Sequence, residues 1–221
     1  MSPEMFSVLD LSARAALLAT LLNAAVGIPL AYILARKPFR GCSAGEVLVT
    51  LPLILPPTVT GYYLIVLLGR RGWLGAPLYE LTGWSVAFTW YAAVIAAAVM
   101  AFPLLVRTAR AAIESVDRDL ERAAFTLGRS EWRTALAVTI PLARNGILAG
   151  LVLTFARALG EFGATLMLAG NIPGRTTTIP LAIYTAVQTG ETAEALVLAG
   201  ALTVLSCLVI LLANRLGTAL T

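Results

Sequence analysis

The sequence predicts an all-α membrane protein with about five transmembrane helices, and its composition is the first observation behind this prediction. Of the 221 residues, 59% are hydrophobic and 13% are charged, whereas soluble domains carry about 25% charged residues. About 20 apolar residues in a helix are enough to cross the hydrocarbon core of a bilayer. The second observation is a set of four such stretches that contain no Lys, Arg, Asp or Glu: 15–35, 47–69, 81–106 and 195–214.

A fifth apolar stretch, residues 145–174, is interrupted only by Arg157 and Glu161. Five buried helices of a soluble protein would leave too little polar surface on a chain of this length, so we prefer the membrane interpretation. No internal repeat or linker divides the chain, and residues 1–221 are expected to form one transmembrane domain. After a short outer segment at 1–14, we expect the spans at about 12–35, 47–69, 84–106, 142–167 and 194–214.

The distribution of basic residues predicts how the chain is oriented. With the loop at 36–46 in the cytoplasm, eleven Lys and Arg residues lie on that side, Arg40 and Arg215 among them, and four lie outside. Cytoplasmic loops carry the excess of basic residues. The N-terminus is therefore expected outside and the C-terminus in the cytoplasm. Because topology explains the basic residues, nucleic acid is not an expected partner.

Several kinds of chemistry are excluded by the residues that the chain lacks. It contains no His, which rules out Ser-His catalysis and His-ligated metals. Lys37 is the only lysine, and Ala35 and Arg36 precede it where an ATP-binding P-loop needs glycine. Cys42, expected in a cytoplasmic loop, and Cys207, expected in the last span, suit neither a disulfide nor a zinc site. We expect no catalytic residue, no metal and no bound cofactor in this chain.

A polar island at residues 107–144 separates the third and fourth spans and holds seven of the sixteen basic residues. Asp117 is expected to cap a helix, and Gly128 to end it. Ser130 with Glu131 is expected to start a second helix toward Pro141. Three charged residues of the first helix, Arg118, Glu121 and Arg122, are expected on its surface. One apolar stripe of the first helix consists of Leu120, Ala123, Ala124 and Leu127. This stripe suits contact with either lipid or a docked protein, and its small alanines favour the protein.

The second span contains prolines that a regular helix does not accommodate. A proline supplies no backbone N–H, and in lipid the freed carbonyls must be buried in protein or face a wet cavity. Two interpretations stay open: a kink packed between helices, or a broken helix that lines a translocation path. In the second case the path would be lined within residues 51–61 by Pro52, Pro56, Pro57, Thr58 and Thr60.

Arg157 and Glu161 are spaced i, i+4 in the fourth predicted span. An ionisable pair inside the membrane is a candidate functional site. Mutual neutralisation would also make the pair a structural or gating element, and we favour that role because Glu161 cancels much of the field with which Arg157 would attract an anion.

The polar island resembles the EAA loop of type I ABC-importer permeases. The resemblance consists of Glu121-Arg-Ala-Ala124, then Gly128 after three residues, then Val138-Thr-Ile-Pro141 after nine more. Val138 and Ile140 are conservative departures from the motif. The resemblance implies that Leu120, Glu121, Ala123, Ala124, Leu127, Gly128 and Pro141 couple the membrane domain to an ATPase.

A narrower resemblance covers nearly the whole chain. Residues 51–61, Phe155–Ala164 and Asn171–Pro180 are similar to molybdate permeases, with tungstate and sulfate permeases as close relatives. This resemblance implies a homodimer in the bacterial cytoplasmic membrane, with two cytoplasmic ATPase subunits that bind ATP and Mg and an external oxyanion-binding protein. Two other classes stay open: an ion-coupled secondary transporter, and a membrane scaffold that transports nothing. Few ionisable residues in the spans and no paired broken helices in matching halves disfavour the secondary transporter.

Overall fold

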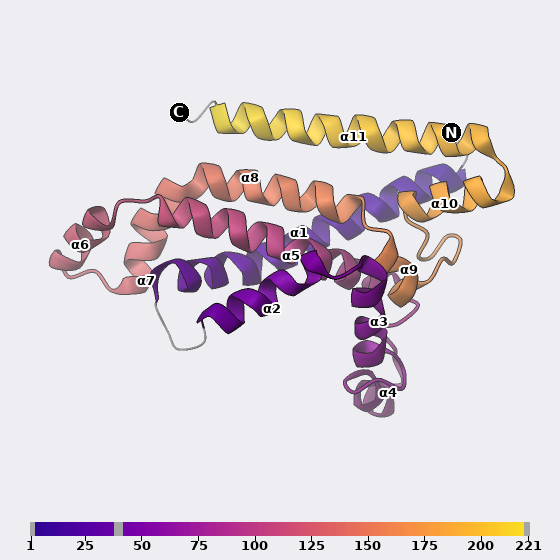
Figure 1. Cartoon of the computed structure of the whole chain (residues 1–221), viewed down its shortest axis with the longest axis horizontal. Coiled ribbons are helices and arrows are strands. Elements are labelled where there is room, and N and C mark those ends of the chain that lie inside the picture. Colours follow the sequence, from indigo (N-terminus) through magenta and orange to yellow (C-terminus); the bar gives the residue numbers. More distant parts are fainter. Residues whose placement is uncertain (1–2, 38–41, 219–221) are drawn as a thin grey trace.

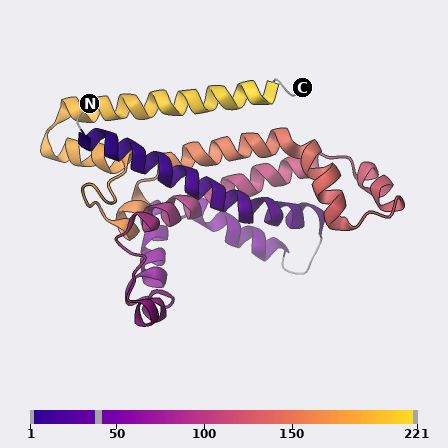
Figure 2. The same ribbon diagram turned by 180° about the vertical axis from the view of Figure 1, so that it is seen from behind.

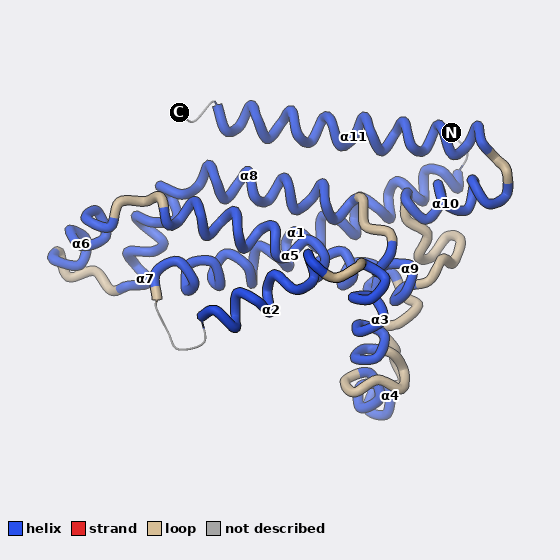
Figure 3. The backbone as a smooth tube through the Cα atoms, in the orientation of Figure 1, coloured by secondary structure: helices blue, strands red, loops and turns tan. Residues whose placement is uncertain are grey.

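A computed structural model describes residues 3–37 and 42–218, and the side chains of residues 5–37 and 44–211. Arg40 and the side chains of Cys42 and Arg215 lie outside this description. All regular structure within the described ranges is helical (Figure 3). The elements are α1 (Pro3–Arg36), α2 (Cys42–Ile54), α3 (Pro57–Leu68), α4 (Gly75–Thr82), α5 (Trp90–Glu114), α6 (Arg118–Thr126), α7 (Glu131–Thr134), the π-helix η1 (Ala135–Thr139), α8 (Ile140–Leu159), α9 (Gly163–Ala169), α10 (Ile179–Thr189) and α11 (Thr192–Thr218).

Four helices in the described ranges are long and apolar enough to cross a membrane, and α2 with α3 supply a fifth if the bent pair is counted as one span. This agrees with the predicted all-α class and the number of spans. The helices α1, α5 and α8 pack on one another, and α11 packs on α8 (Figures 1 and 2). The end of α11 and the helix α6 lie at one end of this bundle, and α1 begins at the other, as an odd number of spans requires (Figure 1).

Small residues allow the two central helices to approach closely. A Cβ placed on Gly146 of α8 would lie 2.4 Å from the Cβ of Ala112 in α5, and one on Gly150 would lie 3.2 Å from the Cβ of Thr108. Close approach of this kind is typical of helix packing in membranes, where dispersion contacts and not water exclusion hold helices together. The core around the same crossing includes Val106, Ala109 and Ile113.

The first helix begins earlier than predicted. Residues 3–14 are helical in the structure, although the sequence suggested a short outer segment there. Proline is tolerated in the first turn of a helix, so Pro3 can start one. Asp10 and Arg14 add an ion pair of 2.8 Å at the i, i+4 spacing, which supports a helix end that extends out of the apolar region.

The second span is broken and not merely kinked. Its halves α2 and α3 meet at an angle of 115°, and α3 with α4 projects away from the bundle (Figure 1). Pro56 and Pro57 have no N–H, so the hydrogen-bond ladder of α2 ends with the 3.0 Å bond from the Leu55 N–H to the Leu51 carbonyl. The carbonyl of Pro56 then accepts bonds from Val59 and Thr60, at 2.9 and 3.1 Å, and these bonds begin α3. Cys42, expected in a loop, is the first residue of α2.

The fourth span ends sooner than predicted. The helix α8 stops at Leu159, and a separate short helix, α9, follows after a break at residues 160–162. Glu161 therefore lies in the break and not in the span helix that carries Arg157. Gly160 is a poor helix former, and the Glu161 carboxylate accepts a hydrogen bond of 2.9 Å from the Ala164 N–H. That bond satisfies a backbone group at the start of α9.

Candidate functional site

Residues 107–114 of the polar island continue α5 beyond the predicted end of the third span, and a helix, a glycine turn and a second helix then follow as predicted. Asp117 precedes α6, and its carboxylate accepts a 2.9 Å hydrogen bond from the Asp119 N–H. Gly128 has φ +77°, a left-handed conformation that glycine adopts without strain. The next helix begins at Glu131 and continues through η1 into α8, so Pro141 lies inside one long helix and not at its end. The wide π turn η1 ends two residues before this proline, which lacks a backbone donor.

The predicted apolar stripe of α6 is divided between two faces. Leu127 is 82% exposed, Leu120 is 49% exposed, and Ala123 is also exposed. Ala124 instead is buried and faces the chain itself. An exposed apolar group of three side chains, Leu120, Ala123 and Leu127, therefore remains available to a partner at this end of the bundle.

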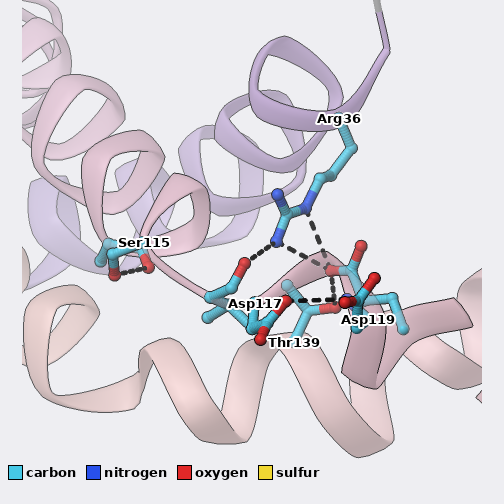
Figure 4. A network of polar contacts seen from close by, with 8 residues as sticks. Arg36, Ser115, Asp117, Asp119 and Thr139 are labelled. Atoms are coloured by element: carbon cyan, nitrogen blue, oxygen red, sulfur yellow. Dashed lines mark hydrogen bonds and ion pairs between the residues drawn. The ribbon is translucent and has the colours of Figure 1, made fainter. Parts of the chain in front are cut away.

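Glu121 is not on the surface of α6, where the sequence pattern placed it. Its side chain is 9% exposed and that of Arg36, at the end of α1, is 7% exposed. Two nitrogens of Arg36, Nε and Nη2, each lie 3.0 Å from Oε1 of Glu121. The hydroxyl of Thr139 donates a 2.6 Å hydrogen bond to the same oxygen. Figure 4 shows Arg36 and Thr139 converging from different helices on this network. Burial of the carboxylate is stable because these donors replace water.

The break between α2 and α3 places the two predicted path threonines differently. Thr58 is exposed, whereas Thr60 is buried against the chain and its hydroxyl has no hydrogen-bond partner among the described residues. Pro56 and Pro57 are exposed and Pro52 is partly buried within α2. Only part of the predicted path segment is therefore accessible in this conformation.

Arg157 and Glu161 are brought together as the sequence spacing suggested. Arg157 Nη1 lies 2.8 Å from Glu161 Oε2, and the side chains are 31% and 2% exposed, respectively. The other carboxylate oxygen accepts the bond from the Ala164 N–H described above. Glu161 thus has two fixed partners, whereas part of the Arg157 side chain stays accessible. This arrangement favours the structural interpretation of the pair.

A family model described as the inner membrane component of binding-protein-dependent transport systems matches residues 27–220. The chain belongs to this family. The molybdenum transport system permease protein ModB of Escherichia coli K12 is 50% identical over 195 residues, which cover 87% of this chain and 85% of that protein. A putative molybdenum transport permease of Bacillus subtilis is 43% identical over 188 residues, or 85% and 83% of the two chains. A sulfate permease, CysW of Synechococcus elongatus, is 39% identical over 171 residues, or 77% and 59%.

Solved structures of this architecture confirm the predicted fold. A chain of the inward-facing MetNI methionine ABC transporter superposes with a TM-score of 0.73 at 16% identity, covering both chains completely. A chain of a bacterial ABC transporter for the polysaccharide alginate gives a TM-score of 0.78 at 18% identity, covering 100% of this chain and 81% of that one. The chain is thus a multi-pass inner membrane protein with the fold of ABC-importer membrane subunits.

Sequence reasoning missed the residues that hold this family member's loop and broken spans in place. Arg36 entered only the count of charges and the exclusion of a P-loop, and Thr139 lay unremarked within the EAA-like motif. Gly61 and Gly163, which let α3 and α9 touch, showed no pattern. No group of three or more His, Cys, Asp or Glu side chains that could hold a metal gathers within the described ranges.

Proposed function

We propose that this chain is the membrane-spanning permease of an ATP-driven importer for molybdate. The observation that carries the proposal is the 50% identity, over 87% of the chain, to a molybdenum transport permease of Escherichia coli. Two sulfate permeases that match are less similar, at 36% and 39% identity over a smaller part of the chain, so molybdate is preferred to sulfate. Tungstate is the alternative substrate of the same class.

The energy for import is assigned to other subunits. This chain has no P-loop, so ATP and Mg would be bound by two cytoplasmic ATPase subunits, and the chain itself would carry no cofactor. The assembled complex, not this polypeptide, would hydrolyse ATP. A second copy of the chain would complete the path, and an external binding protein, periplasmic or surface-anchored, would deliver the oxyanion. The family's dependence on a binding protein supports the last assignment.

The exposed apolar residues of α6 are proposed to enter a groove on the ATPase. Leu120, Ala123 and Leu127 supply the contact, and the turn at Gly128 sets the angle at which α6 is presented. Glu121 and Ala124, which are buried, support the loop from inside the chain, and Pro141, which is exposed, lies in the helix that follows the loop. Apolar side chains exposed together at the end of a membrane protein favour burial against another protein.

The translocation path is proposed to run along the broken spans. The exposed residues Pro56, Pro57 and Thr58 and the accessible part of Arg157 would face it, near the axis of the dimer. Irregular backbone at membrane depth is tolerated where it lines a cavity or is buried in protein, which supports this placement.

Reconstitution in liposomes tests the proposal. The chain is combined with its ATPase and binding protein, and uptake of radiolabelled molybdate is measured with and without ATP, in competition with tungstate and with sulfate. ATP-dependent uptake that unlabelled molybdate suppresses most strongly is the expected result. Uptake driven by an ion gradient in liposomes holding this chain alone would indicate a secondary transporter instead. Absence of uptake under both conditions would support a scaffold.

A further inference from the structure

We propose that Arg36 and Glu121 are positioning residues that clamp the coupling helix α6 to the first membrane helix, so that α6 and α1 move together when the ATPase moves α6. The inference rests on the proposed function, because it assumes that an ATPase acts on α6. It assigns Glu121 to a contact within the chain and not to the ATPase surface.

Few residues attach α6 to the rest of the molecule. Among its nine residues, only Glu121 and Ala124 are buried. The main packing contacts of α6 are to η1 and α7, which follow it directly in the sequence. An alanine buries little surface, so the carboxylate of Glu121 is the main side-chain link from α6 to an element distant in the sequence.

The carboxylate of Glu121 joins α6 to the ends of two other helices. Arg36 is the last residue of α1 and Thr139 the last residue of η1, and both bond to Oε1 of Glu121. Arg36 also donates a 2.9 Å hydrogen bond from Nη2 to the carbonyl of Val116, which lies just before α6. One guanidinium therefore holds both the start of the loop and the middle of its helix. Figure 4 shows Arg36 between these elements.

The contact between Arg36 and Glu121 is suited to transmit motion because it is stiff. Side chains of Arg36 and Glu121 that are 7% and 9% exposed interact with little screening by water or salt. The planar guanidinium and two nitrogens on one oxygen also restrict the angle between the partners. Because α1 packs along α5 and α8, a displacement of α6 is passed through Arg36 to the whole bundle.

The matched pair of variants is Glu121→Gln and Asp119→Asn. Both remove one negative charge from α6 without changing the size of the side chain, but Asp119 pairs with Arg122 on the surface, at 75% and 73% exposure. Hydrogen exchange of the α6 amides, 118–126, is measured on the permease alone in nanodiscs. Glu121→Gln should speed this exchange by about a hundred-fold, as expected for a broken buried pair. Asp119→Asn should change it by less than about five-fold, as expected for a surface pair.

The second readout uses the assembled complex. Glu121→Gln should keep the ATPase bound and hydrolysing ATP, while the number of oxyanions transported for each ATP falls about ten-fold or more, as expected for the loss of a charged hydrogen bond. A residue that only stabilised the fold would lower assembly and leave this ratio unchanged. Thr139→Val removes one hydrogen bond from the same oxygen and should shift both readouts in the same direction by less. It serves as the deciding variant if Glu121→Gln fails to fold.

Two results would overturn the clamp. The first is a rate of hydrogen exchange in α6 that Glu121→Gln raises no more than Asp119→Asn does. Where Glu121→Gln fails to fold, the same comparison is made between Thr139→Val and Asp119→Asn. The second is loss of the ATPase from the Glu121→Gln complex while exchange in α6 stays normal, since Glu121 would then contact the ATPase directly. If the wild-type chain failed to bind an ATPase or to move molybdate, the proposed function would be rejected. The comparison of hydrogen exchange in α6 would still show whether Glu121 holds this helix, because it is made on the permease alone.

Discussion

Gly61 of α3 lies directly against the backbone of Ala164 in α9. A Cβ at Gly61 would be 2.8 Å from the Cα of Ala164 and 2.7 Å from the Cβ of Met167. A Cβ at Gly163 would in turn lie 2.9 Å from the Cβ of Pro57. The short helices that follow the α2–α3 break and the α8–α9 break therefore touch each other, and two glycines allow the contact.

Gly61→Ala is expected to push α3 away from α9, because the contacting atoms are backbone or Cβ atoms that cannot turn aside. Overpacking of this kind costs about 1–3 kcal/mol of unfolding free energy. The change is measured as the midpoint of thermal unfolding of the purified permease in detergent. Gly200→Ala in α11 is the control, since a Cβ there meets nothing within 4 Å. Equal midpoints for the two variants would contradict the close contact.

Leu127→Asp is expected to prevent copurification of the ATPase without disturbing the membrane fold. Leu127 is 82% exposed in the chain, so an aspartate costs nothing until a partner covers it and leaves its charge unpaired. Ala124→Asp would be a poorer probe, because Ala124 is buried in the permease itself and the charge would disturb the chain directly. Leu208→Asp would not serve as a control, because Leu208 lies on an exposed part of the apolar helix α11 and a charge there would disturb the insertion of that helix into the membrane. Retention of the ATPase by Leu127→Asp would exclude this contact.

Gly128→Val is expected to distort the turn after α6 by backbone strain alone. The residue has φ +77° and a Cβ there would meet nothing within 4 Å, so no clash contributes. A β-branched residue tolerates this conformation poorly, whereas asparagine adopts it readily. Gly128→Asn should therefore keep most ATP-driven uptake, and Gly128→Val should lose most of it at normal expression. Similar uptake by the two variants would show that the left-handed turn is not required.

Cysteines at the α2–α3 break are expected to differ in reactivity toward a water-soluble thiol reagent. In a background without Cys42 and Cys207, Thr58→Cys should react quickly because Thr58 is exposed, and Thr60→Cys slowly because Thr60 is 6% exposed. If the path opens and closes during transport, trapping ATP should change the rate at position 58. Full protection of position 58 in every state would favour a break packed against protein and rule out a wet path there.

Arg157→Ala is expected to be more damaging than the double variant Arg157→Ala with Glu161→Ala. The single change leaves the carboxylate of Glu161, 2% exposed, without its cation, and breaking such a pair costs about 3–5 kcal/mol. The double variant leaves no unpaired charge but loses the bond to the Ala164 N–H, a loss of about 1 kcal/mol by analogy with helix caps. Expression, assembly and oxyanion uptake are measured for both. A folded, assembled and inactive double variant would assign Arg157 a direct role with the anion.

Local features of the sequence were sufficient to predict the class of the protein and the shape of its polar loop. Charge-free stretches define membrane helices because burying an ion in hydrocarbon is costly wherever the helix packs. The cap at Asp117 and the turn at Gly128 depend on bonds and φ angles within a few residues. These physical causes are short-ranged, so no knowledge of the rest of the fold was needed.

Only the tertiary structure decided where the charged and small residues of these elements face. Glu121 appears on an amphipathic helix as a surface charge, and its burial depends on Arg36, 85 residues away in the sequence. Gly61 has a role only because α9 lies against it, and α9 packs on the half of the span that the 115° bend between α2 and α3 displaces. A proline marks where a helix must break, but the direction of the chain beyond it depends on packing, which joins residues that no local pattern relates.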